Sequence, residues 1–255
     1  MIRVLVNGAL GRMGRTVVAA VKADSELELV GAVDAFEGEV DGTKVETNLD
    51  AALKKFSPDV MVDFTRPDSV FKNVMLALEK KVSPVVGTTG LTDDAKEKIR
   101  AATEKFQTPA FIAPNFAIGA VLMMLLSRQV AKYLPDVEII ELHHDKKLDA
   151  PSGTAELTAK MISEVRTAHK QGHPDEREVI ANVRGGDYDG IKIHSVRLPG
   201  YVAHQEVIFG GLGQTLTIRH DSTGRDSFMP GVLLACKKVR SLNGLTIGLD
   251  KLLDV

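Results

Sequence analysis

Short apolar runs alternate with helical patterns over the first 115 residues of the chain. Strand-length runs, each bounded by turn residues, lie at 2–6, 28–33, 60–64, 85–86 and 110–113. Between them, helical spacing of apolar residues predicts helices at 12–22, 51–56, 69–81 and 93–105. Strands that are nearly all apolar and alternate with helices are typical of a parallel sheet covered on both faces. The pattern therefore predicts an α/β fold with a Rossmann-like, doubly wound parallel sheet at 1–115.

The pattern changes beyond residue 115. It predicts a long apolar helix at 117–132, a strand at 137–142, a helix at 154–165 and a polar loop at 166–190. Polar and apolar residues then alternate at 191–197, 206–209 and 214–220, which favours antiparallel strands with one open face. We therefore expect a second α+β domain with a mixed or antiparallel sheet at 116–225, for substrate binding and oligomerisation. A tail at 226–255, helical over 229–240, is expected to pack back on the first domain.

Composition and charge exclude several classes of protein. The 255 residues carry 32 Lys and Arg against 34 Asp and Glu, without the basic surplus of a nucleic-acid binder. The longest apolar run, Ala117–Leu126, is shorter than the roughly 20 residues that span a membrane. The single cysteine, Cys236, excludes an internal disulfide and a multi-cysteine metal site, and no metal site is predicted. A strand pattern that begins at once leaves no room for a signal peptide, so we expect a cytoplasmic protein.

A glycine-rich turn links the first predicted strand to the first predicted helix. Gly8, Gly11 and Gly14 follow the spacing G-x-x-G-x-x-G, which differs from the usual dinucleotide fingerprint. Such a turn brings backbone N–H groups and a helix N-terminus close to a phosphate, although a plain connecting turn would also use glycine. Asp34 ends the second strand about 20 residues further on, where a carboxylate would meet a ribose hydroxyl. The combination predicts a site for NADH, NADPH or both.

Coenzyme choice depends on the residues around Asp34. A carboxylate followed by Ala35 favours a free 2′-hydroxyl, so the sequence leans toward NADH, while Arg12 could reach a 2′-phosphate and keeps NADPH open. Ligands of such sheets bind at the carboxyl ends of the strands, although each end taken alone fits ordinary turn chemistry. The expected cofactor contacts are Gly8, Ala9, Leu10, Gly11, Arg12, Met13, Asp34, Phe64, Gly87, Thr88, Thr89, Ala113, Pro114, Asn115 and Phe116.

A second group of polar residues follows the strand predicted at 137–142. His143, His144 and Lys147 are able to donate protons near neutral pH and to bind a carboxylated substrate. The residues Ser152-Gly153-Thr154 then open a helix whose N-terminus suits an anion. The alternative is a solvated charged loop in which Ser152 or Thr154 only caps the helix, and this capping is compatible with anion binding.

Together these motifs resemble the 4-hydroxy-tetrahydrodipicolinate reductase (dihydrodipicolinate reductase) family of bacterial lysine and diaminopimelate synthesis. The resemblance spans nearly the whole chain and rests on residues 8–14, 62–65, 86–90 and 112–119. Its most specific part is 141–155, which matches the family pattern E-x-H-H-x-x-K-x-D-A-P-S-G-T-A. The resemblance implies a two-domain oxidoreductase that uses NAD(P)H to reduce a cyclic imine dicarboxylate to tetrahydrodipicolinate. It also implies a homotetramer built through the second sheet and a site completed by closure between the domains.

By position, the resemblance gives roles to individual residues. His143 corresponds to the general acid/base and Lys147 to the proton donor, while His144, Ser152, Gly153 and Thr154 correspond to substrate contacts. Some family members place an arginine where this chain has Ala35, which leaves the coenzyme preference open. Two rival functions are another nicotinamide-dependent amino-acid or semialdehyde dehydrogenase and a non-catalytic NADH-sensing protein. The segment 143–154 argues against the first, and the acidic charge balance argues against the second.

Overall fold

The computed structural model describes residues 1–254 and divides the chain into two units. The first unit contains Met1–Ile118 together with the segment from Arg225 onward, and the second contains Gly119–Gly224. The segment that completes the first unit therefore follows the whole of the second in the sequence. Within residues 1–254, no helix has the length and apolar character needed to cross a lipid bilayer.

The first unit is built on an eight-stranded sheet with the order β13-β7-β6-β5-β1-β2-β4-β3. All neighbouring strands are parallel except β3 and β4, which pair antiparallel at one edge. The strands are β1 (Ile2–Asn7), β2 (Leu27–Val33), β3 (Gly38–Val40), β4 (Thr43–Glu46), β5 (Val60–Asp63), β6 (Ser83–Val86), β7 (Ala110–Ile112) and β13 (Leu245–Ile247). The predicted Rossmann-like fold class is confirmed.

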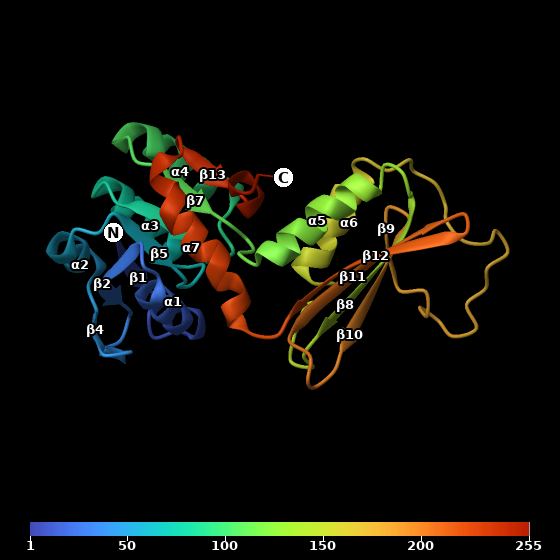
Figure 1. Cartoon of the computed structure of the whole chain (residues 1–255), viewed down its shortest axis with the longest axis horizontal. Helices are drawn as coiled ribbons and strands as arrows, with labels where there is room; N and C mark the ends of the chain where they lie inside the picture. Colours follow the sequence, from blue (N-terminus) through green and yellow to red (C-terminus); the bar gives the residue numbers. More distant parts are fainter. Residues whose placement is uncertain (255) are drawn as a thin grey trace. The chain divides into compact units, whose positions relative to one another are not determined.

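Helices cover this sheet, as Figure 1 shows. They are α1 (Arg12–Ala23), α2 (Leu49–Phe56), α3 (Val70–Glu79), α4 (Asp93–Phe106) and α7 (Met229–Lys238), with short 3₁₀ turns η1 (Arg225–Phe228), η2 (Val239–Ser241) and η3 (Leu249–Leu252). Apolar residues of α2, α3 and α4 pack with the sheet in two clusters, while α1 and α7 contact each other. Because the strands are covered on both faces, consecutive residues such as Val4, Leu5 and Val6 are all fully buried.

The second unit combines two helices with a five-stranded sheet of order β12-β11-β8-β10-β9. Helix α6 contacts β8, β9 and β10. The elements are α5 (Ile118–Val130), β8 (Asp136–His143), α6 (Gly153–Ser163), β9 (Gly186–Tyr188), β10 (Ile191–Arg197), β11 (Ala203–Gly211) and β12 (Gln214–Ser222). β8 is antiparallel to β11 and parallel to β10, so the sheet is mixed.

The sequence pattern did not predict several of the short strands. β3, β4 and β13 were not predicted, and β9 lies inside the stretch predicted as a loop. Each has only three or four residues, which is too short for the alternation of polar and apolar residues to be distinctive. The parallel pairing of β8 with β10 was also not predicted, because alternation reveals which residues share a face and not the direction of the neighbouring strand. The helix α6 between the two strands makes this crossover possible.

Candidate active site

The glycine-rich turn joins β1 to α1 at the carboxyl edge of the first sheet. The backbone N–H groups of Gly8 and Ala9 both donate to the carbonyl of Val33 on β2, at 2.9 and 3.0 Å. Gly8 has a φ of +82°, which favours glycine, and a Cβ on Gly14 would lie 2.0 Å from the Gly8 carbonyl oxygen. The first and third glycines thus allow the sharp turn and the close contact between turn and helix. The spacing is suited to this backbone even though it departs from the usual fingerprint.

Asp34 lies beside this turn, as the sequence predicts for an acidic residue at the end of β2. Its Oδ2 accepts a hydrogen bond of 2.9 Å from the Leu10 backbone N–H, and its Oδ1 accepts one of 2.7 Å from the Ala35 N–H. Gly8, Leu10, Gly11, Asp34 and Phe64 line a cavity of about 580 Å³, together with Asn7, Val33, Ala35, Phe36, Thr47, Leu49, Thr65, Arg66, Ser69 and Asn73. The carboxylate therefore belongs both to the turn and to the cavity wall.

A second cavity of about 340 Å³ is lined by other expected contacts. Its residues are Gly11, Arg12, Met13, Phe64, Thr65, Pro67, Gly87, Thr88 and Thr89. Gly87 is required here, because a Cβ at this position would lie 2.1 Å from the Phe64 ring. Phe64 lines both cavities, and its ring centroid is 5.8 Å from that of Phe116.

The remaining expected cofactor contacts do not line either of these cavities. Ala9, Ala113 and Phe116 are buried within the first unit. Pro114 and Asn115 follow β7 in the turn before α5, where the Asn115 side-chain oxygen accepts a hydrogen bond of 2.8 Å from the Ala117 N–H. These five residues support the carboxyl edge of the sheet, and ten of the fifteen expected contacts line a cavity there.

Asp63, at the end of β5, is the centre of a hydrogen-bond network at this edge of the sheet. It is completely buried, and its Oδ1 accepts hydrogen bonds from the hydroxyls of Thr65 and Thr88, at 2.7 and 2.8 Å. Its Oδ2 accepts from the side-chain amides of Asn7 and Asn73, at 2.9 and 3.0 Å. One carboxylate thus connects the ends of β1 and β5 with the turn after β6 and with α3.

These features fit a dinucleotide. The turn supplies a helix N-terminus and a close backbone approach for phosphates, Asp34 supplies a carboxylate for a ribose, and the adjoining cavities supply open space. Tight glycine contacts at Gly14 and Gly87 keep the edge free of side chains that would fill it.

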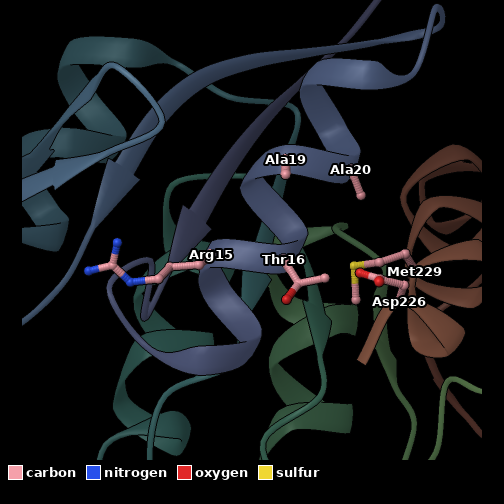
Figure 2. A pocket seen from close by; sticks show the side chains of 6 residues that line it. All are labelled: Arg15, Thr16, Ala19, Ala20, Asp226 and Met229. Carbon is pink, nitrogen blue, oxygen red and sulfur yellow. The ribbon is translucent and has the colours of Figure 1, made fainter. Parts of the chain in front are cut away.

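A third cavity, of about 450 Å³, is lined by residues of α1, η1 and α7. None of the expected site residues lines it. Figure 2 shows Thr16 and Ala20 turned toward Met229, whereas the Arg15 guanidinium points away. That guanidinium donates to the Leu10 carbonyl instead, at 3.0 Å. Small and apolar side chains therefore make up most of the wall, and we assign this cavity no function.

In the second unit, the polar segment begins at the last residue of β8, His143. Its Nδ1 lies 2.5 Å from Oε2 of Glu141, which is two residues earlier on the same face of the strand and fully buried. The Arg197 guanidinium donates to both carboxylate oxygens of Glu141, at 2.8 and 2.7 Å. Burial alone would raise the pKa of Glu141, but hydrogen bonds from His143, Arg197 and Ser195 outweigh it and lower the pKa to about 2.

Lys147 and the start of α6 follow in the next loop. Lys147 Nζ donates to both oxygens of Asp149, each at 2.7 Å. Ser152 caps α6, because its hydroxyl accepts a hydrogen bond of 3.2 Å from the Ala155 N–H. The Ser152 N–H itself donates to Glu141 Oε1 at 3.2 Å. A Cβ on Gly153 would have no neighbour within 4 Å, so the first turn of the helix is open there, and Thr154 is not the cap.

The structure brings together most of the residues expected from the sequence within each unit, and it adds three that sequence reasoning missed. Glu141 had a signal, since it precedes His143 by two residues and so shares its strand face. No signal in the sequence pointed to Arg197, because it lies 56 residues from Glu141 along the chain. Asp63 lies in a segment recognised as a motif, but only the fold shows that four side chains converge on it.

The fold and these sites define a two-unit oxidoreductase of the Rossmann class. A family model described as "Dihydrodipicolinate reductase, N-terminus" matches residues 2–116, and one described as "Dihydrodipicolinate reductase, C-terminus" matches residues 119–253. The chain belongs to the dihydrodipicolinate reductase family.

Individual relatives agree with this assignment. The chain is 54% identical to the 4-hydroxy-tetrahydrodipicolinate reductase of Desulfitobacterium hafniense (strain DSM 10664 / DCB-2), over 99% of each chain. It is 52% identical to the enzyme of that name from Geobacillus kaustophilus (strain HTA426), again over 99% of each. Among solved structures, a dipicolinate-bound dihydrodipicolinate reductase from Paenisporosarcina sp. TG-14 matches with a TM-score of 0.92 and 47% identity, over 99% of this chain and 100% of that one. An amine dehydrogenase from Mycobacterium smegmatis, with a TM-score of 0.65 and 12% identity over 96% of this chain and 94% of that one, shares the fold alone.

Proposed function

We propose that the protein catalyses the NAD(P)H-dependent reduction of 4-hydroxy-tetrahydrodipicolinate to tetrahydrodipicolinate in lysine and diaminopimelate biosynthesis. The observation that carries this proposal is the polar segment of the second unit, in a chain of this family. There, an acid/base histidine and a helix N-terminus are held by one buried carboxylate, through His143 Nδ1 and the Ser152 N–H. Proton delivery and anion binding are the two tasks that a cyclic imine dicarboxylate requires.

The coenzyme is assigned to the first unit. Phosphates are bound by the turn Gly8–Met13 and the N-terminus of α1, and a ribose is bound by Asp34, in line with the cavity that these residues share. The nicotinamide is assigned to the second cavity and its surroundings, with Phe64, Gly87, Thr88 and Thr89 as contacts. Ala113, Pro114, Asn115 and Phe116 complete the proposed contacts after β7.

We propose NADH as the preferred coenzyme. Asp34 directs a carboxylate into the cavity and is followed by Ala35, so that a 2′-phosphate would meet negative charge where an arginine would be needed. Arg12, which was expected to reach a 2′-phosphate, lines the other cavity, whereas Arg66 lines this one and is a second cation that would let NADPH bind as well.

In the proposed reaction, bound NAD(P)H supplies a hydride for C4 of the conjugated imine that forms when the substrate loses water. Electron density then reaches the neighbouring ring carbon, which must gain a proton. His143 and Lys147 deliver and replace this proton, since both carry N–H donors in the same segment. Asp149 holds the Lys147 ammonium in place through two hydrogen bonds.

The substrate carboxylates are assigned to the start of α6 and to His144. Ser152, Gly153 and Thr154 form the first turn of the helix, where backbone N–H groups and the helix dipole favour negative charge. The open space at Gly153 lets a carboxylate approach the backbone directly. His144, which precedes Ser152 in the same polar segment, adds a side-chain donor.

The proposal includes a homotetramer in the cytoplasm. On the face of the second sheet opposite Glu141 and His143, β8, β10 and β11 carry Ile140, Leu142, Val196 and Ile208, and each is only half-buried. Val196 pairs with Leu142, and half-buried apolar residues on one sheet face suit contact with another copy of the chain. Light scattering after size-exclusion chromatography tests the assembly, and cell fractionation tests the location.

The main experiment measures coenzyme oxidation. Purified protein is mixed with NADH or NADPH and the freshly formed condensation product of pyruvate and aspartate semialdehyde, and the loss of absorbance is followed. We expect oxidation well above the substrate-free rate, and a strongly reduced rate for His143→Ala. Failure of both coenzymes to react above the substrate-free rate contradicts the proposal.

A further inference from the structure

Glu141 takes part in no step of the proposed reaction, although it holds both His143 and the start of α6. β8 places Glu141 and His143 on the same face, and β10 pairs Ser195 with Glu141 and Arg197 with His143 in parallel register. These four side chains therefore adjoin one another on two strands. Glu141 is fully buried, so its negative charge must be compensated by protein groups.

Four groups of the protein provide this compensation, and Ser195, which hydrogen-bonds the carboxylate from β10, is one of them. Arg197 donates to both carboxylate oxygens, the Ser152 N–H donates to Oε1, and the His143 ring nitrogen Nδ1 lies 2.5 Å from Oε2. The other charged groups of this network are Lys147 and Asp149, which bind each other, and the Asp149 carbonyl accepts from Arg197 at 2.7 Å. Arg197 thus joins Glu141 to the loop that carries Lys147.

An ionised carboxylate only accepts hydrogen bonds, which determines the form of the histidine beside it. Since Glu141 Oε2 faces Nδ1, the neutral ring must carry its proton on Nδ1 and its lone pair on Nε2. Arg197 stabilises the negative charge of Glu141. The carboxylate therefore accepts the hydrogen bond from His143 but is too weak a base to take the Nδ1 proton. The ring is therefore held in one orientation and in one tautomer.

We propose that Glu141, supported by Arg197, is a positioning residue that fixes His143 as its Nδ1–H tautomer and so makes Nε2 the atom that exchanges a proton with the substrate. The catalytic part of this inference rests on the proposed function, whereas the tautomer does not. The same carboxylate also holds the Ser152 N–H, so the acid/base group and the anion-binding helix are aligned by one side chain.

Nuclear magnetic resonance of the ¹⁵N-labelled full chain tests the tautomer. Long-range ¹H–¹⁵N correlation distinguishes Nδ1–H from Nε2–H rings, and His143→Asn identifies the His143 signals by their loss. We expect the wild-type ring to be in the Nδ1–H form at a pH where it is neutral, and Glu141→Gln to give a mixture of tautomers. A wild-type ring in the Nε2–H form overturns the proposal, and this result does not depend on whether Glu141→Gln folds or on the identity of the substrate.

Glu138→Gln is the matched control for this measurement. Glu138 lies on the opposite face of β8 and also binds an arginine and a histidine, since it accepts from Arg184 at 2.6 Å and lies 2.8 Å from His194 Nε2. The control removes the same charge from the same strand, and we expect it to leave the His143 signals unchanged. A change in tautomer of equal size in Glu138→Gln would assign the effect to the strand and overturn the role of Glu141.

Steady-state kinetics then test the positioning role. Glu141→Gln is expected to lower kcat about 10- to 100-fold with a smaller change in KM, which is the range typical of a partner that orients a functional histidine. Arg197→Lys retains the charge and is expected to lower kcat less. A kcat unchanged in Glu141→Gln, while the wild type is active, contradicts the positioning role; an inactive wild type with the Nδ1–H tautomer contradicts only the proposed reaction.

Discussion

The side-chain amide of Asn7 donates a hydrogen bond of 2.9 Å to Oδ2 of Asp63, which ties the end of β1 to the end of β5 inside the first unit. Three further side chains donate to the same buried carboxylate. Asp63→Asn would direct an amide NH₂ at these donors. We expect the free energy of unfolding to fall by about 1–3 kcal/mol, because a buried donor then lacks a partner. Chemical denaturation measures this loss, and titration with NADH should show weaker binding.

Asp68→Asn is the control for this variant. Asp68 also loses its charge, but it is exposed and its ion pair with Arg66, at 3.2 Å, is solvated. Its effect on stability should stay within about 0.5 kcal/mol. Equal stability losses in the two variants would show that the network around Asp63 has no special importance.

Coenzyme selection is tested by Asp34→Ala. The variant loses the hydrogen bonds to the N–H groups of Leu10 and Ala35, so both coenzymes should bind more weakly because the turn is less well held. The informative quantity is therefore the ratio of kcat/KM for NADH to that for NADPH. We expect this ratio to fall roughly tenfold, equivalent to about 1.4 kcal/mol, since the repulsion of a 2′-phosphate is removed. An unchanged ratio, or a native preference for NADPH, counts against the assignment.

Ser152 and Thr154 should separate stability from substrate binding. Ser152→Ala removes the cap of α6 and is expected to lower the free energy of unfolding by about 1 kcal/mol. Thr154 is the second residue of α6. For Thr154→Ala we expect a higher KM and weaker binding of pyridine dicarboxylate, with NADH affinity nearly unchanged. Thermal melting and kinetics on both variants check this. Normal KM in Thr154→Ala would remove that side chain from the substrate site.

The proton donors should differ from the carboxylate contact in their kinetic signature. Lys147→Ala and His143→Ala are each expected to lower kcat by roughly 10²–10⁴-fold, as for a lost general acid or base. His144→Ala should raise KM with a smaller effect on kcat, because it removes binding and not proton transfer. Steady-state kinetics of the three variants provide the comparison. Wild-type kinetics in all three would exclude this segment from the active site.

Glu141 also makes the stability of the protein depend on acidity. Its pKa in the folded chain is lowered to about 2 from an ordinary value of 4.5, so the folded state binds its proton less readily than the unfolded state. The stabilisation, on the order of 3 kcal/mol, is therefore complete above about pH 5 and is lost as the pH falls toward 2. Denaturation curves between pH 7 and pH 3 should show a shallower decline for Glu141→Gln than for the wild type. Asp93→Asn should change the slope much less, because the Asp93 carboxylate, whose pKa is lowered by Lys96, is exposed and its ion pair is solvated.

Most of the fold follows from the hydrophobic pattern of the sequence. The parts of the fold that do not follow from it have one physical cause in common. β1, β2 and β5 are mostly apolar because both faces are buried over most of their length, and their sequences show it. β13 has only three residues and is a strand because β7 offers it an edge with which to pair. A pairing partner that lies far away in the sequence leaves no local pattern in a strand so short.

The candidate site also contains residues that the sequence pattern predicts and residues that it does not predict. His143, Lys147 and Ser152 were predictable because they lie within one continuous segment and their chemistry is visible in it. The position of Asp34 at the end of the second strand follows from the known order of strand, turn, helix and strand, whereas its hydrogen bond with the Leu10 N–H was not predicted. Arg197 lies in another strand, and its importance depends on parallel pairing that the alternation of residues does not reveal.

The return of the chain to its first unit has a consequence for how the protein is synthesised. β13 pairs with β7, and the Ala110 N–H donates to the Gly244 carbonyl at 3.0 Å, so the last strand of the first sheet belongs to the final residues of the chain. During translation, the coenzyme-binding unit must wait with an open sheet edge while the whole second unit leaves the ribosome. Contacts between such distant residues slow folding, and an open edge invites wrong partners. A nascent chain that stops before residue 245 would thus carry all of the glycine turn and both sets of site residues, and still lack the strand that covers the edge of β7.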